Sequence, residues 1–215
     1  ISALIFLLVV EVLAIQIRSK PDIKGIPLTD NTEITISQLA DDTTLFLRDT
    51  ASLRNALQLI HDFGLSSGLK RNKDKSEAFW IGTKTFSAEK PCGLGWTQES
   101  IKCLGIWCGP DIKSATSKNF TEKIKKLKTT LNMWSQRNLS LKGKIAVLRS
   151  IVMPQVLYPA TVLYCPDWVT QDIDDMFFSF LWSKKVHVKK EVIINEIERG
   201  GLKMPLFSSM VKAIK

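Results

Sequence analysis

The sequence predicts an α+β fold, in which short antiparallel β-hairpins with helices come first and an all-helical part follows. In the first half, short runs alternate between apolar and polar residues on either side of tight turns, which is typical of hairpins. From residue 118 onward, apolar residues recur every three or four positions, which is typical of amphipathic helices. The hydrophobic content is 45% over 215 residues, enough for a globular core, and this argues against disorder.

Residues 2–18 are mostly apolar and predict a buried helix that ends at Ser19-Lys20-Pro21. Glu11 interrupts the apolar run, which is shorter than the roughly 20 residues that span a bilayer. No basic segment precedes it, as one would in a signal peptide. Because the chain opens at Ile1 inside an apolar run, we expect a core helix taken from a longer protein.

The next elements are a hairpin and a helix. Residues 34–39 and 43–47 have the character of strands, which puts Asp41 and Asp42 at the tip between them. The helix that follows has Asp49 and Ser52 as candidate N-caps and ends at Gly64 and Gly68. Its predicted apolar face carries Leu53, Leu57, Ile60 and Phe63.

The middle of the chain is less regular. Residues 78–81 predict a strand, and residues 84–100, with Pro91, Gly93 and Gly95, predict a loop. Residues 101–107 predict a second short hairpin, in which Gly105 allows the bend.

Three helices are predicted after that. The first carries a stripe of Phe120, Ile124, Leu127, Leu131 and Trp134. The second begins after Ser140, carries Ile145, Leu148, Val152 and Leu157, and is kinked or ended by Pro154 and Pro159. The third spans Asp172 to Trp182, with acids at its N-terminus that suit the helix dipole.

Positive charge is concentrated in one quarter of the chain. The whole sequence has a net charge of +9, and residues 111–165 alone hold ten basic and two acidic residues, a net +8. Such asymmetry indicates a polyanionic partner, either nucleic acid or an anionic membrane surface.

The cysteines argue for a reducing, intracellular location, nuclear or cytoplasmic. There are four, Cys92, Cys103, Cys108 and Cys165, in a chain long enough to fold without disulfides. Zinc binding is disfavoured, because only Cys103 and Cys108 are close and both histidines are distant.

Five short motifs resemble, in order, the reverse transcriptase of non-LTR (LINE-type) retrotransposons, and the resemblance extends almost end to end. Ser2-Ala-Leu-Ile-Phe6 is similar to the tail of the nucleotide-pocket motif, and Gln38-Leu-Ala-Asp-Asp42 to the catalytic [Y/F]-A-D-D hairpin. Ser67-Gly-Leu-Lys-Arg-Asn72 with Lys75-Ser-Glu77 resembles the next motif, and Lys102-Cys-Leu-Gly105 the primer grip. Leu139-Ser-Leu-Lys-Gly-Lys-Ile145 resembles the basic thumb. Phe180-Leu-Trp182 and Gly200–Pro205 are similar to segments that follow the polymerase domain in many such elements.

The resemblance implies an RNA-directed DNA polymerase that uses two Mg²⁺ ions, an RNA template, a DNA primer and dNTPs. Asp41 and Asp42 would be the metal ligands, with Asp41 the firmer one, because Mg²⁺ prefers carboxylate oxygens. Lys75 would neutralise or protonate the leaving pyrophosphate. Cys103, Leu104 and Gly105 would hold the primer end. A set of thumb lysines would bind nucleic acid: Lys123, Lys125, Lys126, Lys128, Lys142 and Lys144.

The resemblance also implies a division of the chain. Residues 1–110 would be part of the polymerase palm, 111–165 a basic helical thumb and 166–215 a helical segment after the polymerase. Protein partners are not indicated by the sequence, and no membrane is expected.

Departures from the family pattern matter for activity. The upstream motif that supplies a third Asp is absent from this chain, and Leu39 replaces the usual aromatic residue before Ala40. We therefore expect no polymerase activity from the chain alone. The alternatives are a non-catalytic nucleic-acid-binding module or relic that uses the basic thumb and, more distantly, a peripheral membrane protein anchored by residues 1–18.

Overall fold

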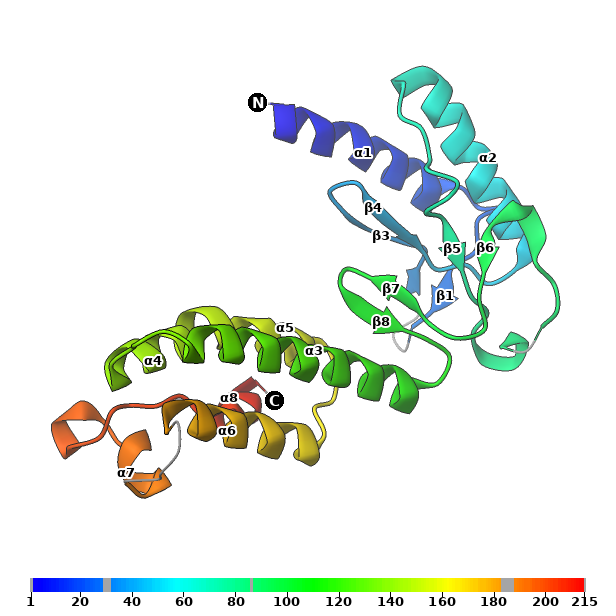
Figure 1. Cartoon of the computed structure of the whole chain (residues 1–215). Coiled ribbons are helices and arrows are strands. Elements are labelled where there is room, and N and C mark those ends of the chain that lie inside the picture. The colour runs from blue at the N-terminus through cyan, green and yellow to red at the C-terminus, as the bar shows by residue number, and fades with distance from the viewer. Residues whose placement is uncertain (1, 29–31, 86, 183–187, 215) are drawn as a thin grey trace. The chain divides into compact units, whose positions relative to one another are not determined.

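The structure is a computed structural model that describes residues 2–28, 32–85, 87–182 and 188–214. The chain divides into two compact units, Ile1–Pro110 and Asp111–Lys215 (Figure 1). Short antiparallel strand pairs occur in the first unit and helices dominate the second, so the predicted α+β class is confirmed. Residues 111–165 and 166–215, which the resemblance separates, share one hydrophobic core.

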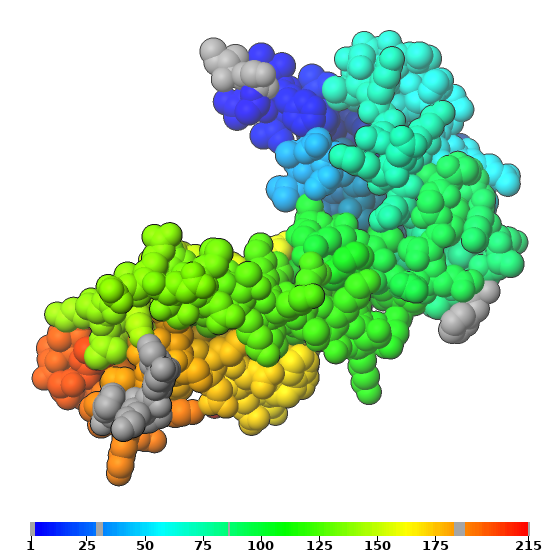
Figure 2. All heavy atoms as spheres, in the orientation of Figure 1, coloured from blue at the N-terminus to red at the C-terminus, as the bar shows by residue number. Residues whose placement is uncertain are grey.

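The first unit opens with helix α1 (Ser2–Ser19), as predicted, but the expectation that it is buried is wrong. Leu13, Ala14 and Ile17 pack into the core of the unit. In the preceding turns most side chains are exposed, with Leu4 67% and Leu8 70% accessible, while Phe6, Val9 and Val10 are half-buried. Figure 2 shows the first part of the chain, in dark blue, at the surface. Apolar composition predicted that this helix would be covered, but most side chains of its first turns are exposed within this unit.

Two antiparallel strand pairs follow. Strands β1 (Ile26–Pro27) and β2 (Glu33–Ile34) form the first. The second is the predicted hairpin of β3 (Ile36–Leu39) and β4 (Asp42–Leu45), in which Leu39 pairs with Asp42 and the turn consists of Ala40 and Asp41.

Helix α2 (Thr50–Ser67) has the predicted caps but a different buried face. Asp49 accepts a hydrogen bond of 2.7 Å from the Ser52 backbone N–H, and Gly68 ends the helix with a φ of 75°. The buried side chains are Ser52, Ala56 and Leu59, while Ile60 and Phe63 are only partly buried. The buried face therefore differs from the predicted one. The Ser52 hydroxyl accepts the Lys24 backbone N–H at 2.9 Å, so this polar side chain faces the inside of the unit.

The rest of this unit is loop with short strands. Strands β5 (Glu77–Ala78) and β6 (Gly95–Trp96) pair in parallel, so the strand predicted at 78–81 is shorter and begins earlier. The 3₁₀ turn η1 (Gly82–Lys84) lies between the predicted strand and the predicted loop, and η2 (Pro91–Gly93) lies within the predicted loop. Trp80, from the predicted strand, stacks on Trp96 with ring centroids 4.5 Å apart. Strands β7 (Ile101–Cys103) and β8 (Ile106–Cys108) form the predicted second hairpin.

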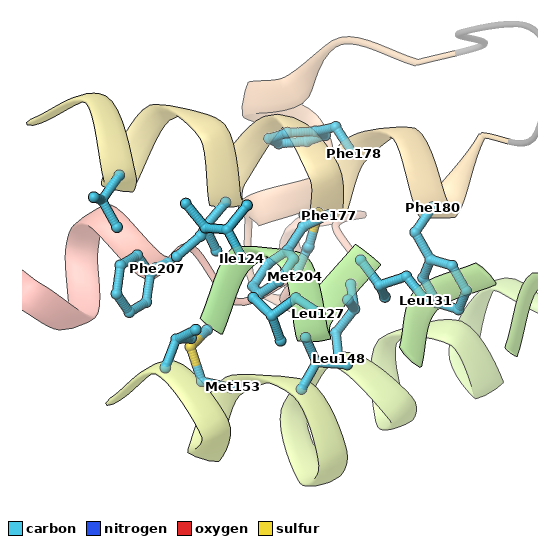
Figure 3. Packing of buried hydrophobic residues seen from close by; sticks show 14 of the residues in the cluster. Ile124, Leu127, Leu131, Leu148, Met153, Phe177, Phe178, Phe180, Met204 and Phe207 are labelled. Atoms are coloured by element: carbon cyan, nitrogen blue, oxygen red, sulfur yellow. The ribbon is translucent and has the colours of Figure 1, made fainter. Parts of the chain in front are cut away.

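The second unit begins with helix α3 (Ile112–Ser135), six residues earlier than the sequence indicates, because Asp111 caps it by accepting the Lys113 N–H. The predicted stripe is confirmed: Phe120, Ile124, Leu127 and Leu131 are buried, and Trp134 is partly buried. Figure 3 shows three of these residues facing side chains from other helices.

The second predicted helix is three segments: α4 (Leu141–Val147), a π-helical turn η3 (Leu148–Val152) and α5 (Met153–Val162). Ser140 caps α4 by accepting the Gly143 N–H. Pro154 lies in the first turn of α5, where its missing N–H needs no partner, and Pro159 lies inside α5 without ending it.

The core of the second unit is closed by the last helices. Helix α6 (Asp167–Leu181) starts five residues before the predicted Asp172, directly after Pro166. Its Phe177, Phe178 and Phe180 join the core, where Figure 3 shows Phe177 near Met204. Helix α7 (Lys190–Ile194), the 3₁₀ turn η4 (Ile197–Arg199) and helix α8 (Phe207–Ile214) follow. Asp174 accepts the Phe207 N–H at 2.7 Å, which holds the start of α8 on α6.

One helical stretch in the described residues, Leu141–Val162, is long and apolar enough to cross a bilayer by length and composition. Its Leu148, Val152 and Val156 are fully buried in the core of the second unit, which gives its apolar character a structural reason.

Candidate functional site

Asp41 and Asp42 lie at the exposed tip of the β3–β4 hairpin. Asp41 is in the two-residue turn, and Asp42 is the first residue of β4. Ala40 adopts a φ of 52°, a left-handed conformation that side chains other than glycine disfavour. Gln38 donates a hydrogen bond of 3.3 Å to the Thr43 hydroxyl across the hairpin, so a strained turn displays two adjacent carboxylates on a paired scaffold.

The second hairpin carries the predicted primer-grip residues. Leu104 and Gly105 form its turn, with φ values of 49° and 80°, as a two-residue hairpin turn requires. Cys103 is half-buried at the end of β7, and Ile106 beside it in β8 is buried. Burial raises the pKa of the Cys108 thiol, and the neighbouring Cys103 adds to the increase. None of the four cysteines, all of which the structure describes, is in a disulfide.

A direct contact joins the two hairpins. The Thr44 Oγ1 atom on β4 lies 3.2 Å from the Cys103 Sγ atom on β7, although the residues are 59 positions apart. The predicted metal ligands and the predicted primer grip are therefore on two hairpins that touch within one unit.

Lys75 lies in an exposed loop that Asn72 organises. The Asn72 side-chain oxygen accepts the backbone N–H groups of Asp74 at 3.1 Å and Lys75 at 3.2 Å, and the Ser76 hydroxyl donates to the Asn72 carbonyl at 2.6 Å. Among the described residues, no ion pair joins Lys75 to Asp41 or Asp42.

The donor set suits a hard cation only in part. Carboxylate oxygens are the ligands that Mg²⁺ prefers, and Asp41 and Asp42 supply them side by side. Within the described ranges, however, no group of three or more His, Cys, Asp or Glu side chains is placed to hold a metal ion. The two aspartates would supply two of the carboxylate ligands of a magnesium site.

The predicted nucleic-acid-binding lysines differ in exposure. Lys125, Lys126 and Lys128 on α3 and Lys142 on α4 are exposed, and Lys123 is half-buried. Lys144 is the exception: it is 9% exposed and its Nζ donates to the Leu181 carbonyl at 3.0 Å. Lys144 is thus directed into the core, and it does not lie on the basic surface with the other lysines.

Two residues near the candidate site were not singled out from the sequence. Thr44 lies in the strand predicted at residues 43–47, and no feature of the sequence indicates its contact with Cys103. Asn72 stood in the quoted motif, but its function as the residue that folds the Lys75 loop becomes evident only from its hydrogen bonds.

Comparison with known proteins identifies the family. The family described as "Reverse transcriptase (RNA-dependent DNA polymerase)" matches residues 1–108. The chain is also similar to the "Transposon TX1 uncharacterized 149 kDa protein" of Xenopus laevis, at 24% identity over 186 residues. That similarity covers 85% of this chain and 14% of the frog protein, so the chain spans about a seventh of its relative. The match over half of the chain shows that the protein belongs to the reverse transcriptase family.

Proposed function

We propose that this chain is part of a LINE-type RNA-directed DNA polymerase and that residues 1–110 contribute the metal-binding hairpin and the primer grip. The observation that carries the proposal is the Thr44–Cys103 contact of 3.2 Å, because it ties the hairpin with Asp41 and Asp42 to the hairpin with Leu104 and Gly105. A polymerase needs its metal ligands and the primer terminus close together.

The chemistry follows from these groups. A pair of Mg²⁺ ions, when bound, supplies charge stabilisation for the attacking and leaving oxygens of phosphoryl transfer. Asp41 and Asp42 would hold the ions, and the hairpin turn would keep their carboxylates in place without a large loss of side-chain entropy. Cys103, Leu104 and Gly105 would orient the primer end, and Lys75 would carry the positive charge that offsets the pyrophosphate.

The same residues support inactivity of the chain alone. Two carboxylates leave the metal pair short of a ligand, and the described residues provide no third one nearby. We therefore propose that the chain does not extend a primer unless another segment supplies that carboxylate.

The second unit is proposed to contact nucleic acid. Helix α3 carries six lysines and a single acid, Glu122, whereas solvated helix faces normally mix both signs. Under this proposal residues 111–165 act as a thumb that follows a duplex backbone, and residues 166–215 complete its core. A non-catalytic module that binds nucleic acid through this surface alone is the second candidate, and the exposure of Lys125, Lys126 and Lys128 favours it.

Manganese-induced NMR line broadening tests the metal site in the chain as it stands, because Mn²⁺ also binds carboxylate oxygens and is paramagnetic. At substoichiometric Mn²⁺, the amides of residues 40–43 should broaden first. Asp41→Asn together with Asp42→Asn should abolish that broadening. Glu196 and Glu198, an exposed acidic pair in the other unit, are the internal control. Equal broadening at both pairs would contradict the metal site.

Primer extension tests the expected inactivity. With a DNA primer on an RNA template and Mg²⁺, the chain should give no product. Robust synthesis would show that two carboxylates suffice for activity, and it would refute the inference that a further metal ligand is required.

A further inference from the structure

One face of helix α1 carries an apolar stripe that is exposed within the first unit. Its four side chains are each 47% to 70% accessible: Ile5, Leu8, Val12 and Ile15. At about 100° per residue, this stripe lies on the side of α1 opposite to Leu13, Ala14 and Ile17, which pack into the core. The core of the first unit therefore does not cover the stripe.

The stripe has the spacing of a coiled-coil seam. Its residues follow one another at intervals of three, four and three positions, which is the alternation of the a and d positions of a heptad. Ile5 and Val12 would be the a positions and are β-branched, and Leu8 would be a d position. That combination favours two parallel helices. The same residues would face each other from two copies, as a symmetric dimer requires.

The charges around the stripe suit a second copy better than a membrane surface. Arg18, the single basic residue of α1, forms an ion pair with Glu11 at 2.9 Å. Helices that lie on membranes are instead rich in Lys and Arg on their polar face. Residues 1–110 hold 12 basic and 12 acidic residues, so two copies of the first unit carry no net charge that would hold them apart.

The area of the stripe is that of a weak dimer. Together with Leu4 at its edge, the stripe exposes roughly 500 Å² of apolar surface, so a pair would bury on the order of 1,000 Å². Contacts of this size lie at the lower limit for specific interfaces. Because α1 is already ordered by its packing on the core, dimerisation would not have to offset the entropy of forming a helix. We expect a dissociation constant in the micromolar range.

We propose that α1 is a dimerisation helix, which pairs in parallel with α1 of a second copy of this chain through Ile5, Leu8, Val12 and Ile15. The proposal is independent of the polymerase assignment, because no residue of the metal-binding or primer-grip hairpin takes part in it.

Sedimentation velocity of the full chain, from about 1 to about 100 µM, tests the dimer. The wild type should change from monomer to dimer as its concentration rises. Leu8→Glu would bring two carboxylates into the seam and should weaken dimerisation at least about tenfold. The control is Leu65→Glu, the same change at an exposed leucine on α2 of the same unit, and it should dimerise like the wild type.

Disulfide trapping locates the contact in a folded chain. Under mild oxidation Leu8→Cys should form a covalent dimer, because in a parallel pair this d position meets its own copy. Leu65→Cys contains the same four native cysteines and should not form one. Equal trapping of the two variants, or trapping of neither, would refute α1 as the contact.

Two other results would overturn the proposal. One is a wild type that stays monomeric over the whole concentration range, or that self-associates as strongly with Leu8→Glu as without it. The other is a monomeric wild type that binds phosphatidylcholine vesicles while Leu8→Glu does not, which would assign the stripe to a lipid surface.

Discussion

Lys144 and Lys142 lie two residues apart on α4, yet they are expected to have opposite functions. The Lys144 Nζ is 3.0 Å from the carbonyl oxygen of Leu181, the last residue of α6, and 5.6 Å from the centroid of the Phe180 ring. Lys142 is exposed. We predict that Lys144→Met destabilises the second unit without weakening nucleic-acid binding. Lys142→Met should weaken nucleic-acid binding without destabilising the second unit.

The magnitude can be worked from the contacts of Lys144. A hydrogen bond from a charged donor contributes about 1.5–3 kcal/mol, and a cation at a helix C-terminus adds about 0.3–1 kcal/mol. Methionine keeps most of the apolar stem, and the removal of a buried charge returns part of the desolvation penalty. The expected loss is therefore about 2 kcal/mol, which is roughly a 30-fold increase in the equilibrium constant for opening.

Hydrogen exchange measured on peptides from α4 and α6 reports on the second unit alone. Lys144→Met should speed exchange there by roughly 30-fold, and Lys142→Met should leave it unchanged. In duplex-binding titrations, Lys142→Met should reduce the salt slope by about 0.9, the value of one phosphate contact. If Lys144→Met leaves exchange unchanged and weakens binding as much as Lys142→Met does, the assignment of Lys144 to the core is refuted.

Three further predictions concern other parts of the chain. The hydrogen bond from the Ser52 N–H lowers the pKa of Asp49 below its ordinary 3.8, so the stability from this cap is complete above pH 3.8 and is lost as the pH falls through the lowered pKa. Asp49→Ala should cost about 1 kcal/mol of unfolding free energy at pH 7 and should remove this part of its decrease at acidic pH, as measured by urea titrations. An unchanged decrease at acidic pH in the variant would contradict the prediction. Ala40→Gly should stabilise the first unit by about 1 kcal/mol, because glycine adopts the φ of 52° without strain, and a lower melting temperature would argue against strain at that turn. Lys125→Glu with Lys128→Glu should weaken duplex binding and flatten its salt slope by at least about 1.8, two phosphate contacts, and no change in either would remove α3 from the proposed interface.

The hairpins and the long amphipathic helix could be predicted because their signals are local. The turn at Ala40 and Asp41 follows from two alternating runs separated by a short gap, and the stripe from Phe120 to Leu131 follows from helical periodicity alone. Local patterns of this kind require no information about which segment lies opposite.

Three of the differences from the prediction depend on parts of the chain distant in sequence. The first turns of α1 are apolar but mostly exposed in this unit, since hydrophobicity measures a preference for burial and not the presence of a neighbour. Ser52 faces inward because Lys24, 28 positions earlier, donates to its hydroxyl. Lys144 is buried because the end of α6 offers it a carbonyl group.

The Thr44–Cys103 contact also bears on which sequence changes this unit tolerates. The two hairpins are each closed by their own two-residue turn, so each can form before they meet. The stretch between them includes residues 87–90, which belong to no helix or strand, and doubling the length of a flexible loop costs only about 0.6 kcal/mol in closure entropy. Insertions at residues 87–90 should therefore be tolerated among relatives, whereas a single insertion in either hairpin would shift its register and displace Thr44 or Cys103 from the contact.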